Sequence, residues 1–235
     1  MKQVDGRWVE VNGIPIFDSM TEVVQPRHTA LVIIDMQNDF VSHGGIADVC
    51  GVDIEPSRAI IPGISRLIES ARRSGVRVIY SQTIFEADLA NVHPAWIYRW
   101  YRDRPIGTNP LPLDKTAIRG TWGAAIIDEL QPQPQDYIVE KHRNSAFVAT
   151  KLERVLKANG VESVVLAGTT TDGPVLSSAL DAQWYDYYTV IAKDAVASTL
   201  PELHNLGIEQ LSTSYELPTV EEMIAIWDVS PVFSR

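Results

Sequence analysis

The sequence predicts one α/β domain with a mainly parallel sheet that helices cover on both faces. From residue 30 onward, short continuous apolar runs alternate with segments of helical spacing. Strands buried on both faces of a parallel sheet carry such uninterrupted runs, and the helices between them form right-handed crossovers. A length of 235 residues suits a single domain of this kind. We therefore expect a Rossmann-like three-layer αβα sandwich.

The individual elements follow from the pattern along the chain. Residues 1–28 are predicted to be an arm, and Asn12-Gly13 within it indicates either a hairpin or an extended tail. Residues 29–235 make up the predicted domain. Apolar runs predict strands at 30–34, 76–80, 136–140, 163–167 and 188–192. Apolar residues at helical spacing predict helices at 57–73, 122–130, 147–158, 174–185, 201–211 and 219–227.

One segment, residues 84–121, interrupts this alternation. It is rich in aromatic residues, proline and glycine, and it includes Trp96 and Trp100. Long insertions in compact domains often form lids or binding segments. The alternative is a packed surface excursion or a subunit contact, and the sequence leaves both interpretations open.

Composition limits the classes of partner. The formal net charge is −10 and no basic run is present, which argues against nucleic acid or an anionic membrane surface as a partner. The apolar runs are too short to span a membrane, and the N-terminus lacks the apolar core of a signal peptide. The single cysteine, Cys50, cannot form an intrachain disulfide. We expect a soluble, cytoplasmic protein that acts on a small molecule.

Polar residues follow three predicted strands at the edge where open α/β sheets bind ligands. Asp35 ends the first apolar run, Lys141 follows the strand at 136–140, and residues 168–174 follow the strand at 163–167. A carboxylate at the end of a buried strand is costly unless it is paired. We predict that Asp35 and Lys141 form a catalytic pair. The alternative is that Asp35 caps a loop and Lys141 is solvated.

Three segments resemble the isochorismatase-like hydrolase superfamily, which includes nicotinamidases, N-carbamoylsarcosine amidases, ureidoacrylate amidohydrolases and isochorismatase. The segments are residues 30–40, 141–147 and 164–182, and the resemblance extends from about Thr29 to Thr199. It implies a six-stranded sheet and a homo-oligomer, either a dimer or a tetramer.

The resemblance also carries expectations for the site. It implies an Asp–Lys–Cys triad whose first two members fall on Asp35 and Lys141. It further implies a cis peptide bond between Thr169 and Thr170.

The chain departs from the family at the position of the nucleophile. The family motif runs Gly, two residues, Thr, two residues, Cys; Gly168 and Thr171 match it, but Pro174 occupies the cysteine position. The acyl-enzyme route therefore lacks its attacking thiolate. The family's oxyanion hole uses the backbone N–H at this position, which proline lacks. One lost donor typically costs about 2.7–4 kcal/mol of transition-state stabilisation.

Three residues are candidates to replace the thiol. Asp172 could orient a water or accept a proton, or it could cap the helix that follows. Ser177 could act as a nucleophile, although serines inside helices usually serve packing. Cys50 could be a relocated thiol, although a small apolar filler is the simpler interpretation.

Three functional hypotheses follow. The first is hydrolysis of an enol ether-type bond in a small carboxylated substrate, as in isochorismatase, whose cysteine position holds glycine; Asp35 would be the general acid or base and Lys141 its electrostatic partner. The second is hydrolysis of an amide or ureido C–N bond by a water that Asp35 activates. The third is a catalytically inactive binding homologue. The protonation state of Asp35 is left open, because burial raises a carboxyl pKa and a nearby ammonium lowers it.

The rest of the predicted site surrounds this pair. We expect the substrate to contact Phe40, Thr170, Asp172, Gly173, Pro174 and Trp122. We expect no metal, because the five histidines are scattered without ligand spacing. We expect no cofactor, because the sequence has no phosphate-binding loop or dinucleotide fingerprint.

Overall fold

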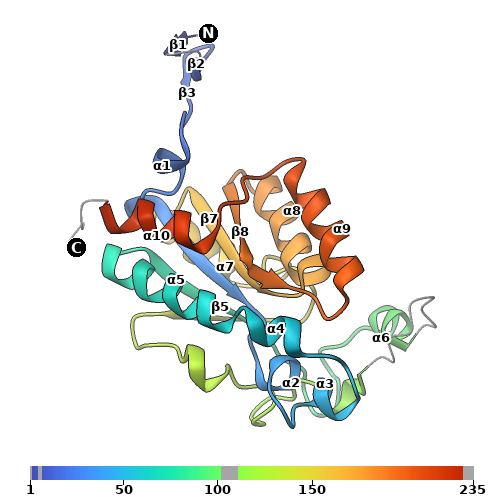
Figure 1. Ribbon diagram of the computed structural model, residues 1–235. Coiled ribbons are helices and arrows are strands. Elements are labelled where there is room, and N and C mark those ends of the chain that lie inside the picture. The colour runs from blue at the N-terminus through green and yellow to red at the C-terminus, as the bar shows by residue number, and fades with distance from the viewer. Residues whose placement is uncertain (1, 5–6, 102–110, 230–235) are drawn as a thin grey trace.

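The computed structural model describes residues 2–4, 7–101 and 111–229, and most of them form a three-layer αβα sandwich (Figure 1). The central sheet is parallel, with the strand order β6-β5-β4-β7-β8. Its strands are β4 (Thr29–Ile34), β5 (Arg77–Thr83), β6 (Tyr137–Lys141), β7 (Ser163–Thr169) and β8 (Tyr188–Ala197). Each strand overlaps the apolar run that predicted it, and the predicted fold class is confirmed.

The sheet has five strands within the described residues, whereas the family resemblance implied six. Beside β8, the chain around Glu216 runs parallel to the strand but forms only one bridge, to Val190. The N–H of Ile191 donates to Glu216 O at 3.0 Å, and the N–H of Lys193 donates to Pro218 O at 2.9 Å. Pro218 has no N–H with which to continue the ladder, so pairing ends there.

Helices cover both faces of the sheet. The first layer contains α5 (Ile61–Ser74) and α10 (Val220–Val229), and the second contains α7 (Leu152–Ala158), α8 (Leu176–Trp184) and α9 (Pro201–Ser212) (Figure 1). The other helices are α1 (Met20–Val23), α2 (Asn38–Val41), α3 (Ile46–Val49), α4 (Glu55–Ala59) and α6 (Pro94–Tyr101). No helix in the described ranges is long and apolar enough to cross a membrane.

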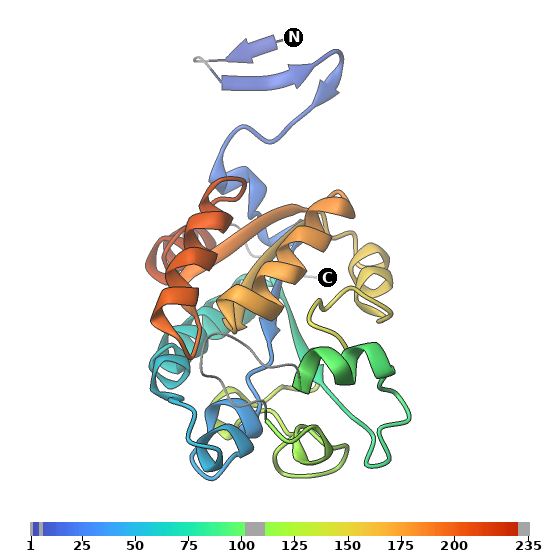
Figure 2. The same cartoon turned by 90° about the vertical axis from the view of Figure 1, so that its right-hand side faces the viewer.

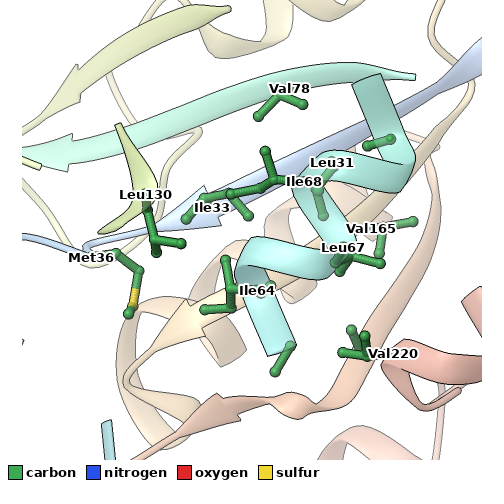
Figure 3. Packing of buried hydrophobic residues seen from close by; sticks show 14 of the residues in the cluster. Leu31, Ile33, Met36, Ile64, Leu67, Ile68, Val78, Leu130, Val165 and Val220 are labelled. Atoms are coloured by element: carbon green, nitrogen blue, oxygen red, sulfur yellow. The ribbon is translucent and has the colours of Figure 1, made fainter. Parts of the chain in front are cut away.

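The alternation of side chains along β4 divides the core into two clusters. Leu31 and Ile33 pack toward α5, where Ile64 and Leu67 meet them (Figure 3). Ala30, Val32 and Ile34 point to the other face and pack with α7, α8 and α9. Every residue of β4 is therefore buried, which explains why the strand is apolar at every position from Ala30 to Ile34 rather than at alternate positions.

The predicted helix at 122–130 is wrong. Only a 3₁₀ turn at Asp128–Leu130 is helical there. The segment instead pairs with the chain after β4: the N–H of Asp39 donates to Gly123 O at 2.9 Å, and the N–H of Asn38 donates to Ala125 O at 3.0 Å. These carbonyls are thereby committed to tertiary partners and are not available to a helix. Periodicity of apolar residues does not reveal such pairing.

The beginning of the N-terminal arm projects away from the sandwich (Figure 2), whereas Val24 near its end is buried in the core. It is an antiparallel sheet of β1 (Lys2–Val4), β2 (Arg7–Val11) and β3 (Ile14–Pro15). Asn12 and Gly13 join β2 to β3 with φ values of +52° and +83°, as a tight two-residue hairpin turn requires. Of the two interpretations of the arm, the hairpin is therefore the one observed.

Gly168 in β7 leaves no room for a side chain against β4. This residue has a φ of +119° and pairs with Ile34, and a Cβ built on it would lie 2.1 Å from Ile34 O. Only glycine allows this approach. It places the ends of the two central strands side by side, immediately before Asp35 and Thr169.

We expect Gly168→Ala to lower the free energy of unfolding by about 3 kcal/mol or more, because it adds backbone strain to a steric clash. Gly63→Ala is the matched control: its Cβ would make ordinary contacts of 3.6 Å or longer inside α5, and alanine favours the helix by up to about 1 kcal/mol. Urea denaturation of both variants measures the difference. Equal stabilities would contradict the close approach at Gly168.

Candidate active site

A cavity of about 500 Å³ opens at the carboxyl ends of the strands, where open α/β sheets bind ligands. Figures 1 and 2 show α2, α3 and α6 gathered at this end, opposite the arm. All five strands contribute to its lining. The contributing residues lie at or directly after the strand ends and are Asp35, Thr83, Lys141, Thr169 and Ser198.

Asp35 and Lys141 form a buried ion pair in this cavity. Lys141 Nζ lies 2.8 Å from Asp35 Oδ2, and the two residues are 1% and 4% exposed. Thr83 connects them: its hydroxyl donates to Asp35 Oδ1 at 3.1 Å and accepts from Lys141 Nζ at 2.8 Å. Lys141 also donates to the carbonyl of Arg143 at 2.9 Å. Lys141 is therefore not solvated, and the alternative interpretation of this residue is wrong.

The backbone at Asp35 turns its side chain into the cavity. Its φ is +53°, a left-handed conformation that aspartate adopts more readily than most residues. The N–H of Asp35 still donates to Ser81 O at 3.0 Å, and its carbonyl accepts from the N–H of Gln37 at 2.8 Å. Asp35 therefore leaves the sheet while both of its backbone groups remain paired.

Burial decides the direction of the carboxyl pKa that the sequence left open. It raises the pKa of Asp35 above the usual value of 3.8, although the Lys141 ammonium and the hydrogen bonds from Lys141 and Thr83 oppose the shift. A carboxyl group with a raised pKa exchanges its proton closer to neutral pH than an ordinary aspartate does. The arrangement is thus suited to proton transfer.

Gln37 holds the bridging threonine in place. Its side-chain oxygen accepts from the N–H of Thr83 at 2.7 Å, and its amide nitrogen donates to the carbonyls of Thr83 and Ala124 at 2.8 Å each. Sequence reasoning missed Gln37 and Thr83. Thr83 carries the same signal as Asp35 and Lys141, a polar residue at the end of a buried strand, but the predicted strand ended at residue 80.

Five of the six predicted substrate contacts line the cavity; they are Phe40, Thr170, Asp172, Gly173 and Pro174. The peptide bond between Thr169 and Thr170 is cis, as the resemblance implied. A Cβ on Gly173 would lie 3.0 Å from Thr170 Oγ1, so any side chain at this position would crowd the cavity wall.

The prediction for Trp122 is wrong. Its side chain is 56% exposed and does not line the cavity. The carbonyl of Trp122 accepts from Asn38 Nδ2 at 2.9 Å. This hydrogen bond holds the Trp122 backbone against the protein, and the indole lies in solvent. The aromatic wall comes from Phe85, Trp96 and Trp100 within the insertion.

The candidate replacements for the thiol differ in their position. Asp172 lines the cavity and accepts a hydrogen bond from Ser198, and no side-chain cap is formed at the start of α8. Ser177 does not line the cavity, and its neighbour Ser178 donates to Pro174 O at 2.7 Å. Cys50, the only cysteine, does not line it either. No sulfur atom borders the cavity within the described chain.

Within residues 2–4, 7–101 and 111–229, no group of three or more His, Cys, Asp or Glu side chains is placed to hold an ion.

Known proteins are similar to this chain in both sequence and fold. A family model described as the isochorismatase domain matches residues 29–222. A ureidoacrylate amidohydrolase from Agrobacterium fabrum is 35% identical over 199 residues, which cover 83% of this chain and 84% of that protein. An isochorismatase-like hydrolase from Alkaliphilus metalliredigens has a TM-score of 0.66 at 30% identity, covering 85% of this chain and 98% of that one. An N-carbamoylsarcosine amidase from Thermoplasma acidophilum has a TM-score of 0.64 at 27% identity, covering 82% and 96%.

We expect Asp35→Asn and Lys141→Met each to lower the free energy of unfolding by about 3–5 kcal/mol, because each leaves a buried partner without its counter-charge. The double variant should lose much less than the sum of the two. Urea denaturation of the four proteins at pH 7 measures this coupling.

Arg119→Gln is the control, because Arg119 pairs with Glu140 at an exposed site. The free energy of unfolding should change far less in Arg119→Gln than in either buried substitution, because solvent screens an exposed ion pair. Additive losses for the Asp35 and Lys141 substitutions would contradict the ion pair.

Proposed function

Because the chain belongs to the isochorismatase family of hydrolases, we propose that it hydrolyses an amide or ureido C–N bond in a small molecule. The buried pair of Asp35 and Lys141 inside the cavity carries this proposal. Relatives support the choice of bond, since one is named a ureidoacrylate amidohydrolase and another an N-carbamoylsarcosine amidase. The sequence alone favours enol-ether hydrolysis; these relatives support the C–N alternative better, so the order of the two hypotheses is reversed.

In the proposed reaction, ionised Asp35 accepts a proton from a water molecule as the water oxygen attacks the carbonyl carbon. The C–N bond of the resulting tetrahedral adduct then breaks, and Asp35 returns its proton to the departing nitrogen. Lys141 and the Thr83 hydroxyl hold the carboxylate oriented toward the cavity. The ammonium also stabilises negative charge that develops on the carbonyl oxygen.

A direct attack by water suits a site with Pro174 at the position of the family nucleophile. The route forms no bond to the protein, so it needs neither a thiol nor a second deacylation step. The Asp172–Ser198 pair lines the same cavity and supplies polar groups that orient the water or the substrate. The remaining predicted contacts, Phe40, Thr170 and Gly173, are proposed to form the walls of the substrate site.

The retained ion pair also bears on the third hypothesis, that of an inactive homologue. Two buried charges cost free energy to desolvate, and a binding protein without catalysis would have no need of them. We further propose a homo-oligomeric, cytoplasmic protein without nucleic-acid partners. The family resemblance supports the first of these, and the net charge of −10 supports the last.

We expect the protein to release ammonia from at least one substrate in a panel of small amides and ureido acids that includes 3-ureidoacrylate. Asp35→Asn should lower kcat by about 10²–10⁴-fold, the usual contribution of a general base. A coupled ammonia assay measures both the activity of the wild type and the kcat of Asp35→Asn.

Cys50→Ser is the control for a thiol mechanism, because Cys50 does not line the cavity, and its activity should equal that of the wild type. Pyruvate release from isochorismate without ammonia release from any member of the panel would reject C–N hydrolysis. Full activity of Asp35→Asn would reject the role of the carboxylate.

The pH dependence separates a general base from a general acid at Asp35. Because burial raises its pKa above 3.8, the carboxylate takes up its proton at a higher pH than an ordinary aspartate. If ionised Asp35 is the base, kcat/KM falls as the pH decreases through this raised pKa. A general acid would instead lose activity as the pH rises through it. Rates measured from pH 4 to 9, with stability followed in parallel, distinguish the two.

A further inference from the structure

One wall of the cavity carries a cation that has no carboxylate partner among the described residues. Arg143 borders the cavity two residues after Lys141 and forms no ion pair within the described part of the chain. Its Nη1 donates to the carbonyl of His142 at 2.6 Å, and its guanidinium carbon lies 5.9 Å from the centroid of the Trp96 ring. The remaining N–H groups of the guanidinium are therefore left for a ligand.

Trp96 supplies a second donor beside this cation. It belongs to α6 and lines the cavity, and its indole N–H is buried without a hydrogen-bond acceptor among the described residues. A buried donor left unpaired is costly. Trp100, one turn further along the same helix, shows the contrast, because its indole N–H donates to Leu111 O at 2.5 Å. Of these two indoles of α6, only that of Trp96 lacks an acceptor among the described residues.

Backbone contacts set the position of this wall relative to the reacting pair. Lys141 Nζ donates to the carbonyl of Arg143, so the residue that carries the free guanidinium is held against the ammonium of the ion pair. The same cavity has apolar lining residues that include Phe85 and Leu203. A ligand in the cavity can thus meet the buried ion pair and a nearby guanidinium together.

We propose that Arg143 and the Trp96 indole N–H together bind a carboxylate on the substrate and select anionic over neutral amides. The identity of the cleaved bond rests on the proposed function; the carboxylate contact does not. A guanidinium and a second N–H donor match the oxygens of a carboxylate. The protein carries a net charge of −10, which repels anions in general, so an unpaired cation inside the cavity offsets that repulsion where the substrate binds.

Turnover tests the proposal with a substrate pair that differs only in this charge, 3-ureidoacrylate and its methyl ester. Arg143→Gln should lower kcat/KM for the acid by about 10–100-fold, mainly through KM, as expected for a hydrogen bond to a charged group, and by less than about 3-fold for the ester. Trp96→Phe keeps an aromatic ring but removes the indole N–H, so it should cost about 3–10-fold on the acid and have a smaller effect on the ester.

Arg119→Gln removes an exposed arginine that already has carboxylate partners, Glu86 and Glu140, and should leave both substrates unaffected. Equal losses on acid and ester in Arg143→Gln would overturn the proposal and assign Arg143 to holding α6 in place.

A binding measurement separates this inference from the proposed function, because it needs no turnover. In ligand-observed NMR titrations, the wild type should bind propionate more tightly than propionamide, and Arg143→Gln should abolish the difference. If no amide is hydrolysed but this preference is present and depends on Arg143, the carboxylate contact stands and C–N hydrolysis fails. If the wild type shows no preference for propionate, or Arg143→Gln retains it, the carboxylate contact is overturned.

Discussion

The candidate site depends on one buried ion pair, between Asp35 and Lys141. Removing two such charges from water costs several kcal/mol for each ion before their attraction is counted. The structure meets this cost locally, since Thr83 contacts both charges and the carbonyl of Arg143 accepts from the ammonium. These groups come from different strands, so the pair forms only when the parallel sheet is assembled in register. The sheet and the site are therefore parts of one arrangement.

The sheet also explains how a family site persists without the family nucleophile. Pro174 stands in the turn after β7, whereas Asp35 and Lys141 lie at the ends of β4 and β6. The absence of a thiol at residue 174 therefore leaves the ion pair at the other strand ends in place. The proposed attack by water needs no nucleophile in the turn at residue 174, because the protein need only position the water and the carbonyl.

The insertion forms one wall of the cavity. Helix α6 brings Trp96 and Trp100 to the cavity, and the cation–π contact with Arg143 joins this helix to the segment that follows Lys141. Of the two interpretations left open for residues 84–121, a binding segment is the one that the described part supports. Residues 102–110 of that segment lie outside the described ranges.

The sequence by itself determined the fold class, the strand positions and the two charged residues at the centre of the site. Those features are local: a strand buried on both faces must be apolar throughout, and a charged residue that ends such a run has to be paired. Only the tertiary structure decided which polar groups meet. It brought Thr83 and Ser198 into the cavity, turned Trp122 outward, limited the sixth strand to a single bridge at Glu216, and let burial prevail over Lys141 in raising the pKa of Asp35. The physical reason is that periodicity along a chain records whether a side chain is buried, whereas hydrogen-bond partners and desolvation depend on neighbours that are distant in sequence.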